Sequence, residues 1–472
     1  MHHSITPSLQ LSKVLMGFVS CLCLCAFVVS PAVSSAQRIN LPPVTRSTWD
    51  NGVRLVLMEY HKAPTLSVTC QFPGGSAAAP ADKSGVAGLT ADLLRKGTVA
   101  RSATQIAEEI DFLGGSLGAG AGDDRFTVSL NVLMKDVTAG LDLLADIVRR
   151  PTFPPEELER ERQLSLAALQ SIGEDPGSVA RRVGTEVVFA GHPYGTEPTV
   201  TSIKGISRDD IAGFYRTVVV PERMTIVAVG DFKATEMTAL LRTRFGDWPK
   251  SGNMLPATPP VKPGARKIVL IDKPDATQTQ VRYLRTAFKR TSPDHFAAEV
   301  ASTALGGGFT SRLTDEIRVN RSLTYGIGSG FAEQLAGGSF VVSTFTKIET
   351  TRALLDAVRG VLQKAVAGGI TPAELAKVKK YLAGTFAIQM QTPEAIAGEL
   401  AEMAFYGLPN DYLQTYIAKL TAVSLADVNH IAKTYFAPNA LSIVMVAPAK
   451  SVNSQLKNLG AIETRSVETV GK

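Results

Sequence analysis

An internal duplication constrains the fold of this chain more than any other feature of its sequence. Residues 207–229 have a counterpart in residues 424–446, and Ser424 lies 217 positions after Ser207. Each copy begins with a Ser followed three residues later by an Asp, a pattern that caps the start of a helix. Each copy then reaches a Pro and a β-branched run, which predicts that a strand follows the helix. The repeat therefore predicts two halves of similar fold.

Both halves open with strand-like runs and continue with helical patterns. The expected strands are residues 53–60 and 66–72 in the first half, and residues 267–271 and 277–288 in the second. Helices are expected after the capping box at Ser102, over residues 141–148, and over the long pair 352–367 and 372–390. Strands followed by runs of helices are typical of α+β folds. We expect two α/β sandwich domains, each a mostly antiparallel sheet with helices packed on it.

A proline-rich segment separates the halves. The chain has 472 residues, of which 45% are hydrophobic, enough to build more than one core. Residues 249–264 contain five prolines and no apolar period, which favours an extended linker. The predicted organisation is an N-terminal domain over residues 37–248, the linker 249–264, a C-terminal domain over residues 265–465 and a tail over residues 466–472.

Residues 1–36 have the pattern of a secretory signal peptide. Lys13 precedes an apolar run over residues 14–29, and small residues follow at Ser34, Ser35 and Ala36. We expect cleavage after Ala36, an exported and periplasmic protein, and no membrane association of the mature chain. A retained membrane anchor is the alternative, because the apolar run is close to spanning length.

Charge and cysteine content narrow the range of partners and covalent links. The formal charge is +6, and +5 without residues 1–36, with acidic and basic residues interspersed. This distribution is typical of a solvated surface, and we expect no nucleic-acid partner. Cys70 is the one cysteine after residue 36, so no intrachain disulfide can form. Its place in the strand-like run 66–72 predicts a buried structural thiol.

A helix near the N-terminus has the frame of a metal site without its ligands. Residues 85–98 read Gly-Val-Ala-Gly-Leu-Thr-Ala-Asp-Leu-Leu-Arg-Lys-Gly-Thr. This stretch resembles the zinc helix of the pitrilysin and mitochondrial-processing-peptidase family, the inverzincins, whose pattern is Gly-x-Ala-His-x-x-Glu-His followed by Gly-Thr. On that pattern Gly88 and Asp92 stand at the two His positions and Ala91 stands at the general base. The family's third ligand, a Glu in a later helix, corresponds to Ala168.

A zinc site is not expected in this chain. Of the four degenerate positions only Asp92 has a side chain that could touch a metal, and one carboxylate cannot hold zinc without converging partners. No catalytic residue for hydrolysis and no metal ligand is therefore predicted.

The second half carries a more specific positive signal. Residues 306–325 resemble the family segment that ends in an Arg and a Tyr seven residues apart, and Arg318 and Tyr325 match that pair. The resemblance implies that the pair faces the zinc of a competent assembly across the cleft and holds the substrate. An Arg fork and a Tyr hydroxyl can orient a peptide carbonyl and stabilise the oxyanion that develops on it. For Arg312 and Arg321 we expect surface or ion-pair roles.

The resemblance covers nearly all of the chain after residue 36 and implies a two-lobed clamshell. Residues 113–119 are similar to the family's glycine-led strand beside the cleft, and residues 190–195 are similar to a family loop. The histidines after residue 36 stand singly, without a ligand partner at fixed spacing, and are expected to be loop or packing residues: His61, His192, His295 and His430. No Ser/His/Asp or Cys/His set offers a substitute nucleophile.

These observations predict a non-catalytic subunit that positions substrate in a heterodimeric zinc metallopeptidase and is inactive alone. The resemblance implies a zinc-bearing homologous partner, with peptides as substrates and no cofactor in this chain. The alternative is a structural or peptide-binding clamshell protein with no role in catalysis. An independently active enzyme with a rebuilt site is disfavoured.

Overall fold

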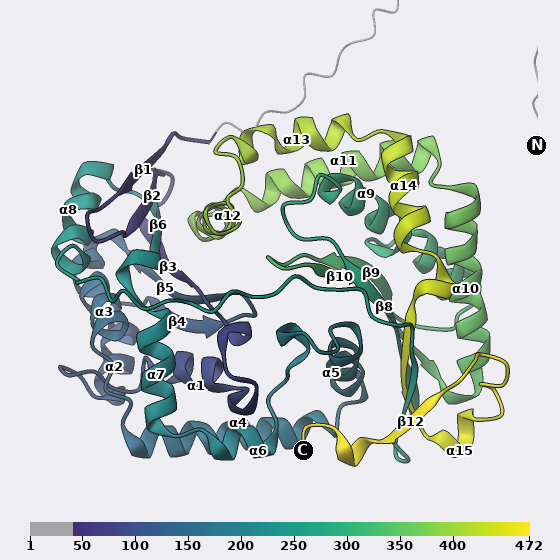
Figure 1. The fold of residues 1–472 in the computed structure, drawn as a ribbon. Coiled ribbons are helices and arrows are strands. Elements are labelled where there is room, and N and C mark those ends of the chain that lie inside the picture. Colours follow the sequence, from purple (N-terminus) through teal and green to yellow (C-terminus); the bar gives the residue numbers. More distant parts are fainter. Residues whose placement is uncertain (1–40) are drawn as a thin grey trace, which may run out of the picture. The chain divides into compact units, whose positions relative to one another are not determined.

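Two six-stranded sheets organise the part of the chain that a computed structural model describes, residues 41–472. The predicted signal peptide, residues 1–36, lies outside the described residues. In Figure 1 the two sheets lie on opposite sides of the view, and helices surround them. This is an α+β architecture of two similar lobes, which confirms the predicted fold class.

The two sheets have the same strand order. The first is ordered β1-β2-β6-β3-β5-β4 and the second β12-β7-β11-β8-β10-β9. The first sheet contains β1 (Val44–Thr48), β2 (Arg54–Glu59), β3 (Thr65–Pro73), β4 (Ser116–Ala121), β5 (Arg125–Leu133) and β6 (Thr225–Gly230). The second sheet contains β7 (Ile268–Asp272), β8 (Gln278–Ala287), β9 (Ile327–Ala332), β10 (Gly338–Lys347), β11 (Ser442–Ala447) and β12 (Glu463–Ser466).

The sheets differ only at one edge. Strand β1 comes from the N-terminal side and pairs antiparallel with β2, whereas β12 comes from the C-terminal side and pairs parallel with β7. In both sheets the next pair, β2 with β6 and β7 with β11, is parallel, and the remaining pairs are antiparallel. The predicted duplication and the mostly antiparallel pairing are confirmed.

Helices account for most of the remaining chain. They are α1 (Val86–Leu93), α2 (Ala103–Phe112), α3 (Val137–Arg149), α4 (Pro155–Ile172), α5 (Pro176–Val188), α6 (Val200–Gly205), α7 (Arg208–Val218), α8 (Ala234–Phe245), α9 (His295–Gly306), α10 (Thr351–Gly368), α11 (Pro372–Gln389), α12 (Pro393–Tyr406), α13 (Tyr412–Ala422), α14 (Leu425–Tyr435) and α15 (Ala449–Val452). A π-helical segment, Thr314–Asn320, follows α9. The capping boxes predicted at Ser102, Ser207 and Ser424 are all present.

Each sheet carries helices of its own half on one face. Leu55, Leu57, Val68 and Cys70 of the first sheet belong to a core with α1, α3 and α7. The corresponding face of the second sheet, including Tyr283, packs against α9, α10 and α14. This packing follows from strand geometry, because every second side chain points to the same face of a sheet. The apolar side chains on that face are buried when helices cover it.

The opposite face of each sheet is covered by a helix from the other half. Helix α5 packs against β8 and β11 of the second sheet, and α12 packs against β3 and β6 of the first. The two helices are equivalent in the repeat, because Pro393 follows Pro176 by 217 positions. A hydrogen bond from the buried Gln71 side chain of β3 to the Ala401 carbonyl of α12 fixes one of these contacts at 2.8 Å. The two halves therefore exchange equivalent helices.

Polar contacts also join the halves. The Leu335 amide of the second half donates to Asp124 Oδ2 of the first at 2.9 Å, and the Ala336 amide donates to the Tyr194 hydroxyl at 3.1 Å. Residues 249–264 contain no helix or strand, and the Val261 amide donates to the Ala336 carbonyl. At the other end of the chain, the Val200 amide donates to the Gly471 carbonyl.

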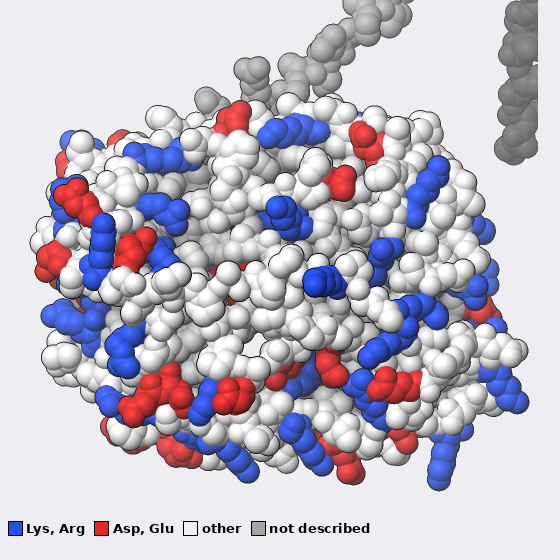
Figure 2. Space-filling view, in the orientation of Figure 1, with Lys and Arg blue, Asp and Glu red and all other residues white. Residues whose placement is uncertain are grey.

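Two surface properties bear on the expected partners. On the face shown in Figure 2, basic and acidic side chains are interspersed and do not form one continuous patch of either sign. None of the helices within residues 41–472 combines the length and apolarity required to cross a membrane.

Candidate functional site

Helix α1 directs two residues into a cavity of the first half. Six of its eight residues are buried in the hydrophobic core, and only Gly88 and Asp92, one turn apart, lie on the open face. The helix starts at Gly85, whose φ of +101° suits glycine and whose absent Cβ would lie 2.4 Å from Ile203 Cδ1. Local packing thus fixes the direction in which positions 88 and 92 point.

Three of the four degenerate zinc positions meet at this cavity. Gly88, Asp92 and, from α4, Ala168 line a space of about 830 Å³. A Cβ built on Gly88 meets nothing within 4 Å, so the cavity has room for a larger side chain there. Ala91 is 1% exposed and belongs to the hydrophobic core instead.

The residues present do not fit a zinc ion. Gly88, Ala91 and Ala168 have no donor atoms in their side chains, which leaves Asp92 alone. Within residues 41–472, no three His, Cys, Asp or Glu side chains are grouped so that they could share a metal. A structural or catalytic zinc needs three or four such ligands.

Asp92 also sits in an unfavourable electrostatic setting. Burial raises the pKa of the Asp92 carboxyl, and the nearby Glu161 carboxylate raises it further. Glu161 itself forms an ion pair with Lys96 at 2.8 Å. The resemblance already placed Ala168 of the same helix beside α1, but the sequence did not single out Glu161, because its contact with Lys96 depends on the fold.

Arg318 and Tyr325 lie at one cavity of the second half. The cavity has a volume of about 640 Å³, and both residues line it. Arg318 belongs to the π-helical segment, and Ser322 takes a left-handed φ of +54° in the turn that leads to Tyr325. π-helical turns are rare and frequently occur at functional sites. Both residues thus border the same cavity, where the π-helical segment leads toward β9.

The pair is accessible and partly oriented by an aromatic ring. Tyr325 is 82% exposed, and the Arg318 guanidinium lies over the Phe309 ring at 5.3 Å from its centre. Such a cation–π contact holds the guanidinium plane without using its hydrogen-bond donors. Both side chains therefore have donors available for a ligand.

The segment between α9 and the π-helical segment, which begins with Gly307 and Gly308, is held to the start of α11 by hydrogen bonds of Arg312. Arg312 forms two hydrogen bonds with the Glu374 carboxylate, at 2.6 and 2.7 Å, and also donates to the Gly369 carbonyl. The Arg312 guanidinium lowers the pKa of Glu374 to about 2. Arg321 pairs with Glu316 at 2.7 Å. The ion-pair roles expected for Arg312 and Arg321 are confirmed.

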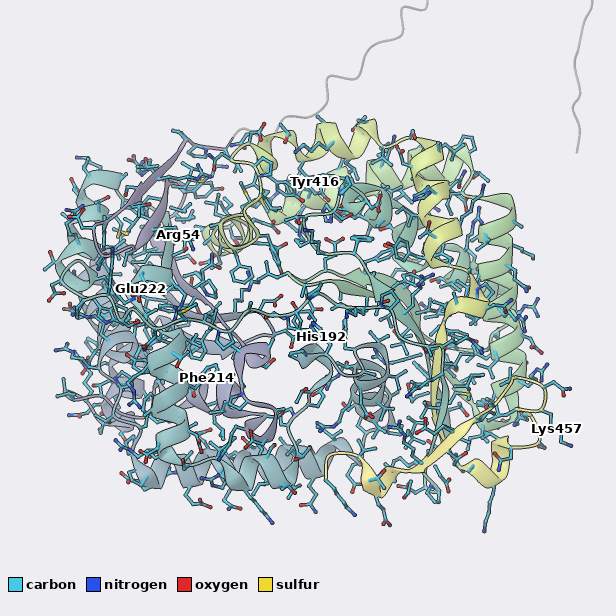
Figure 3. The ribbon with its side chains drawn as sticks, viewed as in Figure 1. Arg54, His192, Phe214, Glu222, Tyr416 and Lys457 are labelled. Atoms are coloured by element: carbon cyan, nitrogen blue, oxygen red, sulfur yellow. The ribbon has the colours of Figure 1, made fainter. Side chains whose placement is uncertain are left out.

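His192 is a packing residue, as predicted. Its Nε2 lies 2.7 Å from the Pro259 carbonyl, and its Nδ1 accepts a hydrogen bond from the Tyr194 amide. Figure 3 shows His192 beside the extended linker. The residue thus holds the linker against the first half.

The other histidines differ from one another. His61 pairs with Asp231 at 2.6 Å on the surface, and His430 is exposed. His295 belongs to a polar cluster, with its Nδ1 2.8 Å from Glu333 and its Nε2 3.0 Å from the Tyr412 hydroxyl. Sequence reasoning treated His295 as an isolated residue because these partners are distant in the chain.

Cys70 is a buried thiol of β3, as predicted, and burial raises its pKa. A thiol with a raised pKa is a poor nucleophile. Cys70 therefore belongs to the hydrophobic core.

Comparison with known proteins identifies two matching family models. Residues 54–197 match the model described as insulinase (peptidase family M16), and residues 205–382 match the model described as the peptidase M16 inactive domain. The second match contains both Arg318 and Tyr325.

Relatives with similar sequences cover most of the chain. An uncharacterized zinc protease of Mycobacterium leprae is 28% identical over 82% of this chain and 88% of its own length. A protein of Helicobacter pylori named as a non-peptidase homolog, YmxG, is 25% identical over 84% of this chain and 92% of its own length.

Two solved structures share the fold. The peptidase M16 inactive domain from Pseudomonas fluorescens has a TM-score of 0.80 and 27% identity, and covers 86% of this chain and 98% of its own. A protease from Helicobacter pylori has a TM-score of 0.80 at 20% identity, over 86% of this chain and 100% of its own.

Proposed function

The chain belongs to the M16 peptidase family, and on that premise we propose that it is the non-catalytic, substrate-positioning subunit of a heterodimeric zinc metallopeptidase outside the cytoplasm. One contrast supports the proposal most strongly. Arg318 and Tyr325 share an accessible cavity, whereas the zinc positions of α1 and α4 offer a single carboxylate. The chain can hold a peptide and has no means of its own to activate water.

In this proposal Arg318 and Tyr325 act on the scissile carbonyl. The guanidinium and the phenol donate hydrogen bonds to the carbonyl oxygen and hold it in place while negative charge develops on it. Phe309 keeps the guanidinium plane in position from below. The metal and the general base belong to the partner subunit.

The test is reconstitution with a homologue that carries His-x-x-Glu-His, followed by cleavage of a quenched fluorescent peptide. Hydrolysis is expected to require both chains. Tyr325→Phe and Arg318→Ala each remove a donor to the oxyanion and are expected to lower kcat about 10²-fold. Arg321→Ala is the matched control, because Arg321 lies on the same segment but pairs with Glu316; its activity is expected to stay near that of the wild type.

Two outcomes would contradict the proposal. Chelator-sensitive hydrolysis by the isolated chain would mean that it holds a metal centre. Cleavage by the pair that is indifferent to both substitutions would favour the alternative, a structural or peptide-binding protein, to which the name of the Helicobacter pylori relative also points.

A further inference from the structure

A smaller cavity adjoins the one that holds Arg318 and Tyr325. It has a volume of about 290 Å³ and shares Gly326 and Ile327 with the larger cavity. Its floor is the sheet face formed by β8, β9 and β10, and Gly177 and Ala180 of α5 cover it. A group bound beside Tyr325 can therefore extend into this space.

Arg282 of β8 is the charged residue of this smaller cavity. Its cross-strand neighbours are Val444 and Ser343, and the next residue on the same face, Leu284, lies in the apolar core under α5. The Arg282 Cδ lies 3.6 Å from where a Cβ on Gly184 of α5 would be. The stem of Arg282 is thus packed between sheet and helix, and its head faces the cavity.

This guanidinium has no acidic partner among residues 41–472. No hydrogen bond or ion pair connects it to any described side chain, and the charge that shifts its pKa is that of another cation, Arg181 of α5. Burial and Arg181 together lower the pKa of Arg282. Two buried arginines, by contrast, have acidic partners: Arg182 has Glu197, and Arg290 has Glu402.

The larger cavity also has an excess of positive charge. Its cations are Arg318 and Lys377, and its one acid, Glu374, is neutralised by Arg312. A half-buried cation without a counter-charge lowers the stability of the chain, so an anion that occupies the cavity gains most of the interaction. Gln280 and Ser343 in the same lining supply neutral polar groups beside the charge.

We propose that Arg282 forms a carboxylate-binding subsite that selects peptides carrying an acidic side chain or a free C-terminus next to the bond held by Arg318 and Tyr325. The proposal deepens the proposed function and rests on it for the identity of the ligand as a peptide. A planar carboxylate can accept two parallel hydrogen bonds from the Arg282 fork. Substrates of the assembled enzyme are then acidic near the cleavage point.

The experiment measures peptide binding to the full mature chain by fluorescence anisotropy. The probes are labelled hexapeptides with one Glu placed at each successive position, the matching Gln peptides, and a Gln peptide with a free C-terminal carboxylate. All the other peptides carry a C-terminal amide. The comparison therefore distinguishes binding of a side-chain carboxylate from binding of a terminal carboxylate. At the best position the Glu peptide, or the free-carboxylate peptide, is expected to bind about tenfold more tightly than its neutral match.

Variants assign that preference to Arg282. Arg282→Gln is expected to abolish the ratio between charged and neutral peptides. Arg46→Gln is the matched control, because Arg46 is also without an acidic partner in the described residues but lies exposed in the first half, and it is expected to keep the ratio. A ratio near one in the wild-type chain, or a ratio unchanged by Arg282→Gln, overturns the subsite.

A stability measurement guards against a merely structural role. Arg282→Met keeps the aliphatic stem beside Gly184 and removes the charge, and it is expected to raise Tm. A fall in Tm would mean that the charge is compensated within the chain, which contradicts the proposal. The cleavage assay with Arg318→Ala tests the proposed function separately, so failure of the subsite and failure of that function give different results.

Discussion

Asp92 is a residue of the first cavity whose charge is disfavoured by its surroundings. Burial is the main cause that raises its pKa, and Glu161 adds to it. The folded chain therefore binds a proton at Asp92 more readily than the unfolded chain does. Ionised Asp92 lowers stability above the raised pKa, and this penalty disappears as the pH falls below the ordinary value of 3.8.

Asp92→Asn is accordingly expected to stabilise the protein at pH 7 by about 0.5 to 1 kcal/mol, the usual size of a single stabilising substitution. Thermal melts at pH 7 and at pH 3.5 check the prediction, and the gain is expected only at the higher pH. Lower stability of the variant at pH 7 would show instead that the carboxylate makes a net favourable contact, with Arg95 and Lys96 as the candidates.

Single residues also show where sequence reasoning stops. Arg318 and Tyr325 could be selected from the sequence because they form a pattern seven residues apart. Arg282 and His295 could not, because their significance depends on neighbours that the fold supplies: α5 above Arg282, and Glu333 and Tyr412 around His295.

At the scale of elements, one side chain at the start of α11, that of Glu374, makes two stabilising interactions. Glu374 completes the capping box with Thr371, and it also accepts two hydrogen bonds from Arg312. The loop that leads to Arg318 is therefore anchored to a helix start.

Glu374→Gln is expected to lower the free energy of unfolding by about 1 to 2 kcal/mol at pH 7, from a weakened cap and a lost, partly exposed ion pair. The folded-state pKa of Glu374 is about 2 against an ordinary 4.5, so the ionised form stabilises the fold above pH 4.5, and this contribution is lost as the pH falls toward 2. Urea melts from pH 7 to pH 2.5 measure the difference.

Glu316→Gln is the control, since the Glu316 and Arg321 pair is solvent-exposed, and a change within about 0.5 kcal/mol is expected. An equal loss in both variants would mean that the anchoring role of Glu374 is wrong.

Most individual elements were predictable. Strand-like runs identified β2, β3, β7 and β8, and capping boxes identified the starts of α2, α7 and α14, because these signals are local. The destinations of α5 and α12 were not predictable. An apolar helix face indicates that it must be buried, but it does not indicate against which of two similar sheets.

At the scale of the whole molecule, the exchange of α5 and α12 makes each half depend on the other. Without α12 the first sheet exposes residues such as Met58 and Val229, and without α5 the second exposes Val444 and Leu284. Neither half can complete its core alone.

Fragments 41–248 and 265–472, expressed separately, are therefore expected to lack cooperative thermal unfolding, and co-expression is expected to restore a complex with one transition. Circular dichroism and calorimetry of each fragment and of the co-expressed pair make the measurement. A fragment that alone unfolds cooperatively near the Tm of the intact chain would contradict the exchange as a requirement for folding.

The same exchange limits how the protein can move. Swinging one lobe away from the other would pull α12 off β3 and β6 and α5 off β8 and β11, so we expect residues 41–472 to move as one unit. If the chain pairs with a zinc-bearing partner as proposed, we then expect a peptide to reach the Arg318 and Tyr325 cavity through motion of the whole protomer against that partner.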